Sequence, residues 1–171
     1  FMLGRRASCI SVALLKDQKP VYGAVYDPYS DRYYSAMPGK GAFCNEQPIH
    51  VSNRPAFAGV ALLGSAPYQK ERTGRAVAEI AYELLMQFAD LRRIGSAALE
   101  ICSVACGEAE SYCEPILSPW DFAACSLILT EAGGRITDFN GNPIRYDHPT
   151  PVLAATSTVY DTILSIVKDK I

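Results

Sequence analysis

A change in hydrophobic pattern near residue 55 constrains the fold more than any other feature of the sequence. Over residues 8–51, short apolar runs separated by polar turns follow one another, which is typical of an antiparallel meander of strands. From Gly59 onward, strand-like runs alternate with segments whose apolar residues recur at helical spacing. This order predicts an α/β (α+β) layered sandwich, an antiparallel meander followed by alternating strands and helices in a mixed sheet. We assign residues 1–55 to part of an N-terminal sheet domain and residues 56–171 to a C-terminal α/β domain.

The limits of helices and strands in the second part follow from periodicity and from terminal residues. An apolar stripe predicts a helix over residues 74–88, and Pro119 suits the first turn of a helix that stops before Gly133. Ser157 is a good N-cap residue for the last helix. We also expect a helix over residues 97–106 and strands over residues 59–63, 110–113, 135–138 and 151–155.

Charge and hydropathy argue against two classes of partner. The formal net charge is -2 and the chain has no block of like charges, whereas binding of nucleic acid calls for a basic patch. No apolar run is long enough to span a bilayer. We therefore expect neither a nucleic-acid nor a membrane partner, and we place the protein in the cytoplasm.

The cysteines fit a reducing compartment. The chain has 6 cysteines and 2 histidines, and no two cysteines form a Cys-x-x-Cys pair. Cys102 and Cys106 fall one turn apart on an expected helix. We expect free thiols that serve as small buried side chains, with a redox or metal role as the alternative.

Two strand-to-helix turns carry residues suited to chemistry, because ligands of alternating α/β structures gather at such turns. The first is Gly95-Ser96-Ala97. Gly95 lets a ligand approach the backbone closely, and the free amides at a helix start favour anions or hydroxyl oxygens. The alternative is that Ser96 only caps the helix.

The second turn brings two carboxylates to one rim. Glu114 is expected to end a strand, and Asp121 to lie in the first turn of the next helix. Such oxygens suit a hard divalent cation, although one aspartate cannot hold Mg²⁺ alone. Asp121 as a helix cap and Glu114 as a surface charge are the alternatives. We expect Trp120, between them, to pack rather than to contact a ligand.

Taken in order, these segments resemble the inositol monophosphatase family. The C-terminal signature of that family, roughly G-[ST]-A-A, Y-x-E, W-D-x-A-A and E-A-G-G, is similar to four stretches of this chain. They begin at Gly95, Tyr112, Trp120 and Glu131. The central segment of the family is similar to residues 11–13, 23–28 and 39–45.

The resemblance implies a sandwich of the α-β-α-β-α type and Mg²⁺-dependent hydrolysis of a phosphate monoester by water. It implies that Asp121 is a metal ligand and that Glu114 contacts a hydroxyl of the substrate. The backbone of Gly95, Ser96 and Ala97 would lie beside the substrate. A homodimer is implied as well.

The substrate expected first is inositol 1-phosphate, because the spacing of Tyr112 and Glu114 matches that branch of the family. Fructose 1,6-bisphosphate, histidinol phosphate and nucleotide 3′-phosphates are the alternatives. The other metal ligands of the family lie upstream of the position that matches Phe1, so we expect a further segment before it. A protein that truly started at Phe1 would instead be a non-catalytic interaction protein.

Overall fold

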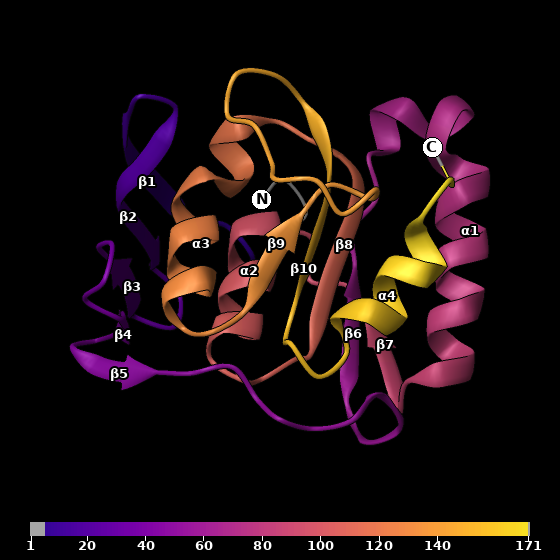
Figure 1. Cartoon of the computed structure of the whole chain (residues 1–171), viewed down its shortest axis with the longest axis horizontal. Helices are drawn as coiled ribbons and strands as arrows, with labels where there is room; N and C mark the ends of the chain where they lie inside the picture. Colours follow the sequence, from indigo (N-terminus) through magenta and orange to yellow (C-terminus); the bar gives the residue numbers. More distant parts are fainter. Residues whose placement is uncertain (1–5, 171) are drawn as a thin grey trace.

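The computed structural model describes residues 6–170 and folds the first of them into an antiparallel sheet. Its strands pair in sequence order, which confirms the predicted meander. They are β1 (Ile10–Lys16), β2 (Lys19–Asp27), β3 (Arg32–Ala36), β4 (Ala42–Cys44) and β5 (Gln47–Ile49). Figure 1 shows this sheet at one end of the molecule.

The second sheet is mixed, as predicted, and has the order β7-β6-β8-β10-β9. Strand β6 runs parallel to β7 and β8, whereas β10 runs antiparallel to β8 and β9. The strands are β6 (Val60–Leu63), β7 (Asp90–Arg92), β8 (Ser111–Leu117), β9 (Arg135–Thr137) and β10 (Thr150–Ala155).

The helices are α1 (Lys70–Gln87), α2 (Ala97–Ala105), α3 (Pro119–Glu131) and α4 (Tyr160–Val167), with short 3₁₀ turns η1 (Ala56–Ala58) and η2 (Pro67–Gln69). Two expected limits are wrong. Helix α1 starts before Gly74, which lies inside it. Ser157 does not cap α4, because the carbonyl of Thr156 accepts the amides of Val159 and Tyr160 and this turn delays the helix. No helix described in residues 6–170 is long and apolar enough to cross a membrane.

The elements stack in the order sheet, helices, sheet, helices. Figure 1 shows α2 and α3 between the two sheets, and α1 and α4 on the far side of the second sheet. One buried cluster joins both sheets to the middle helices through residues such as Val25, Phe122 and Val152. A second cluster, with Ile80, Leu84, Leu153 and Ile163, lies beneath α1 and α4. The predicted layered α+β sandwich is confirmed.

The face of β1 that points away from the middle helices is apolar. Ile10, Val12 and Leu14 alternate along the strand and are all more than half exposed. In an α-β-α-β-α sandwich a helical layer would cover this face, and the described residues provide no such layer.

The six cysteines are free thiols, as predicted. Burial is complete for Cys102, Cys113 and Cys125, whereas Cys9, Cys44 and Cys106 are partly exposed.

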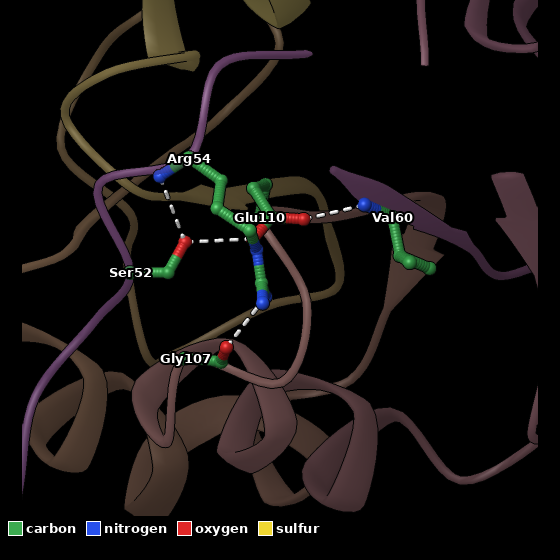
Figure 2. Close-up of polar contacts among 5 residues, drawn as sticks. All are labelled: Ser52, Arg54, Val60, Gly107 and Glu110. Carbon is green, nitrogen blue, oxygen red and sulfur yellow. Dashed lines mark hydrogen bonds and ion pairs between the residues drawn. The ribbon is translucent and has the colours of Figure 1, made fainter. Parts of the chain in front are cut away.

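A buried glutamate ties the segment between the two sheets to the second sheet (Figure 2). Glu110 precedes β8 and is 0% exposed. Its carboxylate accepts hydrogen bonds from the Ser52 hydroxyl at 2.6 Å, from Arg54 Nε at 2.7 Å and from the Val60 amide. Arg54 also donates to the Gly107 carbonyl. A buried charge needs such partners, so Glu110 fixes the path of the chain where the pattern of the sequence changes.

Candidate functional site

The turn from β7 to α2 has the backbone expected of a close approach. Gly95 has a φ of +95°, a conformation that residues with a Cβ rarely adopt. Ser96 is the N-cap residue of α2, yet its side chain makes no capping hydrogen bond. Its hydroxyl lies 3.6 Å from Cys9 Sγ instead. The proposed capping role of Ser96 is therefore wrong.

Glu114 lies within β8 rather than at its end, which corrects the expected strand limit. The strand continues to Leu117 because β10 pairs with it along this stretch, with Val152 opposite Glu114. The side chain is 8% exposed, so Glu114 is not a surface charge. The buried hydroxyl of Tyr112 donates a hydrogen bond to Glu114 Oε2. Burial raises the pKa of Glu114, and this hydrogen bond acts in the opposite direction.

The Glu114–Tyr112 pair fits only because residue 64 is a glycine. Gly64 follows β6, and a Cβ there would lie 2.5 Å from the Tyr112 hydroxyl and closer still to Glu114 Oε2. No side chain can stand so near to these atoms without displacing them. No sequence pattern marks Gly64.

Asp121 lies in the first turn of α3, as expected. Its Oδ2 accepts the amide of Ser118 at 3.1 Å, so Asp121 does cap the helix. Its other oxygen accepts no hydrogen bond from residues 6–170. Burial raises the pKa of Asp121, and the Ser118 amide partly offsets the rise. The adjacent Trp120 is 74% exposed, so the expectation that it packs in the protein is wrong.

The predicted site residues line two adjoining cavities. The first, which we call the Glu114 cavity, has a volume of about 260 Å³, and its walls include Gly64, Arg93, Glu100 and Glu114. The second, the Asp121 cavity, has a volume of about 470 Å³, and its walls include Cys9, Ser96, Trp120 and Asp121. Gly95 and Ala97 line both. The structure thus brings together the five residues singled out from the sequence.

Glu100 and Arg93 also line the Glu114 cavity, and the sequence motifs did not predict either as a site residue. Glu100 is 1% exposed, and its carboxylate accepts the amides of Ile94 at 2.8 Å and Gly95 at 3.3 Å. Burial raises the pKa of Glu100, and the two amides partly offset the rise. The sequence did hold a signal for Glu100, because it is the lone charged residue in the segment that forms α2.

The described residues could supply at most one side-chain ligand to a metal ion. Asp121 offers one carboxylate oxygen that is free of hydrogen bonds from residues 6–170. Within the same range, no group of three or more His, Cys, Asp or Glu side chains is placed to hold a metal ion. Mg²⁺ takes near-octahedral oxygen ligands, so these residues fit one ligand of such an ion and do not complete its coordination.

Comparison with known proteins identifies the family. The sequence model of the inositol monophosphatase family matches residues 1–171. This chain belongs to the inositol monophosphatase family. Proteins of this family depend on a metal.

Individual relatives cover most of the chain. The Nus factor SuhB of Xylella fastidiosa is 40% identical over 134 residues, which are 78% of this chain and 48% of that protein. Bovine inositol monophosphatase 1 is 32% identical over 95% of this chain and 60% of its own length. The staphylococcal enzyme SaIMPase-II, solved with inositol monophosphate bound, is 32% identical. It superposes with a TM-score of 0.85 over 96% of this chain and 63% of its own. The chain therefore spans about half to two thirds of the length of these relatives.

Proposed function

We propose that this chain is the part of an Mg²⁺-dependent phosphate monoesterase that carries one metal ligand and the contacts to the alcohol of the substrate. Inositol 1-phosphate is the proposed substrate. The observation that carries the proposal is the meeting of Gly95, Ser96, Ala97, Glu114 and Asp121 at two cavities that adjoin. These residues come from separate stretches of the sequence, and membership of the family supports the same chemistry.

The residues divide between two tasks. Asp121 would hold the metal through its free oxygen, and a bound Mg²⁺ would supply positive charge that stabilises the phosphate and activates water. Glu114 would accept a hydrogen bond from a hydroxyl of the sugar or cyclitol. The main chain at Gly95 and Ala97 would lie along the substrate between them. A buried acceptor of this kind selects for hydroxyl groups, because a ligand without one leaves the acceptor unpaired.

The test is phosphate release by the full-length protein. Inositol 1-phosphate, fructose 1,6-bisphosphate, histidinol phosphate and a nucleotide 3′-phosphate would be compared over a titration of Mg²⁺. We expect the highest kcat/KM for inositol 1-phosphate and no turnover without a divalent cation. Another ester at the top of this panel would correct the substrate, and absence of turnover with every ester would refute the phosphatase proposal.

Asp121→Asn tests the metal ligand. Asparagine keeps an oxygen that can accept the Ser118 amide but loses the charge, so folding should be preserved while turnover falls by orders of magnitude. Asp161→Asn is the matched control, because Asp161 is an exposed aspartate in the first turn of α4. We expect near-normal activity from the control. Near-normal activity of Asp121→Asn at saturating Mg²⁺ would rule out the assignment.

A second candidate function is association with another macromolecule. It is favoured by the name of the relative from Xylella fastidiosa, a Nus factor, and by the apolar outer face of β1. One variant distinguishes the phosphatase function from association with another macromolecule. An Asp121→Asn variant that is inactive but keeps every partner of the wild-type protein would assign association to a surface away from the cavities.

We also propose that the protein is a homodimer of the cytoplasm. The proposal of a dimer is supported by the family, and that of the compartment by the free cysteines. Light scattering of the full-length protein would give the oligomeric state. A mass equal to one chain would contradict the dimer.

A further inference from the structure

The carboxylate of Glu100 holds the turn that precedes α2. Glu100 points back from the first turns of the helix, with Oε1 accepting the amide of Ile94 and Oε2 accepting the amide of Gly95. Each oxygen therefore has its own donor, and in this arrangement the two oxygens of a carboxylate satisfy both amides. A glutamate at 1% exposure would otherwise be costly in an apolar helix.

No other side chain in residues 6–170 accepts a hydrogen bond from the main-chain amides of this turn. Ser96 makes no capping bond, and Arg93 reaches the carbonyl of Ser65 rather than the turn. Gly95 is left-handed here, but a glycine has no Cβ and can adopt many other backbone conformations. The backbone alone therefore does not fix the shape of the turn. The position of Gly95 and Ala97 against the two cavities therefore depends on Glu100.

We propose that Glu100 is a positioning residue for the substrate. It acts by fixing the Ile94–Ala97 turn against the wall that the Glu114 and Asp121 cavities share. This inference rests on the proposed function, because it takes the substrate to lie along Gly95 and Ala97. Glu100 itself lines the Glu114 cavity, on the same wall as Arg93 and Gly95.

The charged groups that face Glu100 are few. Arg93 favours the ionised form of Glu100 and also that of Glu114, whereas Glu100 disfavours ionisation of Glu114. The two amides of the turn are the direct partners of Glu100. A change at residue 100 that preserves size but removes one acceptor should therefore act first on the turn.

Glu100→Gln is that change. The side-chain amide of glutamine has one oxygen and one NH₂ group. The main-chain N–H of either Ile94 or Gly95 would then face this NH₂, which is also a donor, and the turn must shift. Because the turn contacts the bound alcohol rather than the reacting phosphate, binding in the ground and transition states should weaken alike. In the full-length protein with Mg²⁺, we expect KM for inositol 1-phosphate to rise about tenfold while kcat stays within about twofold.

Glu110→Gln is the matched control. Glu110 is as deeply buried and also accepts a main-chain amide, but its partners Ser52, Arg54 and Val60 line neither cavity (Figure 2). We expect Glu110→Gln to lower the free energy of unfolding and to leave KM within about twofold of the wild type. Glu100→Asp keeps both oxygens on a shorter stem, so its KM should lie between those of the wild type and Glu100→Gln.

Hydrogen exchange of the amides at residues 94–97 gives a readout that does not depend on catalysis. These amides should exchange faster in Glu100→Gln than in the wild type, and Glu110→Gln should leave them unchanged. If the glutamine variant does not fold, Glu100→Asp is judged by the same two readouts.

Three results overturn the inference, and they are distinct. Unchanged exchange at residues 94–97 would show that Glu100 does not hold the turn. Faster exchange with an unchanged KM, or with a fall in kcat alone, would show that the turn does not position the substrate. A wild-type protein that hydrolyses no phosphate ester would refute the proposed function, and with it the role in substrate binding.

Discussion

Gly64→Ala is the substitution that tests the candidate site most directly from its geometry. The added Cβ would stand 2.5 Å from the Tyr112 hydroxyl and closer to Glu114 Oε2, while real Cβ atoms keep at least 3.0 Å. The Glu114–Tyr112 pair must therefore move by at least about half an ångström. Tyr112 is fully buried in the core, so its ring has little room to follow.

The expected cost follows from what the displaced pair loses. A buried hydroxyl or carboxylate left without its partner costs about 1–3 kcal/mol, and overpacking of a core costs a similar amount. We expect Gly64→Ala to lower the free energy of unfolding by about 1–3 kcal/mol, measured by urea denaturation of the full-length protein. Displacement of Glu114 should also raise KM for inositol 1-phosphate.

Gly74→Ala is a control for this prediction, and Tyr112→Phe is a second-site change that should relieve the clash. Gly74→Ala adds the same methyl group within α1, where it would meet no atom within 4 Å. It should stabilise the protein by about 0.5–1 kcal/mol, because alanine favours a helix over glycine. Tyr112→Phe removes the Tyr112 oxygen, which is one of the atoms that the Cβ would meet, so the double variant should be more stable than the sum of the single effects implies. Additive effects, or a Gly64→Ala variant as stable as the wild type, would refute the reasoning.

Three further predictions concern ionisation, selectivity and thiols. Glu114→Gln should reduce discrimination between inositol 1-phosphate and other esters more than it reduces the affinity for Mg²⁺; slowing of every ester by one common factor would contradict this. Burial raises the folded-state pKa of Glu100, Glu114 and Asp121, so at these three groups the folded protein binds more protons than the unfolded chain. The stability contributed by these groups should thus fall as pH rises above their ordinary pKa values, 4.5 for glutamate and 3.8 for aspartate. In urea unfolding at a series of pH values, the free energy of unfolding should fall less steeply with rising pH for Glu114→Gln than for the wild type. Thiol titration in denaturant without reductant should count all 6 cysteines, and two fewer would mean a disulfide.

The sequence predicted the fold well because its signals were local. Alternation of apolar residues located the strands of the meander, and Gly133 and Pro119 marked the ends of α3. One wrong limit arose where tertiary pairing overrides such signals. β8 extends beyond Glu114 because β10 continues to pair with it, and no local pattern reports a partner that lies about forty residues away in the chain.

The site was predicted less completely than the fold. Ordered motifs identified Glu114 and Asp121, since a family signature records residue type and spacing. No sequence motif predicts Gly64, because its role is to leave room for the side chains of Tyr112 and Glu114. These lie beside it only because β6 and β8 pair in parallel. The exposure of Trp120 also could not be read from the sequence, because a large aromatic residue is more often buried than exposed.

The arrangement of charge at the two cavities explains why a phosphate ester would need a cation there. Helices α2 and α3 both begin at the Asp121 cavity, and the free amides of a helix start favour an anion. Three carboxylates nevertheless line the two cavities, from Glu100, Glu114 and Asp121, against the single guanidinium of Arg93. Burial raises the pKa of all three carboxyl groups and so disfavours their charged forms. Three acidic groups at these cavities would repel an anionic ester, so we expect the proposed phosphatase to need a bound cation there.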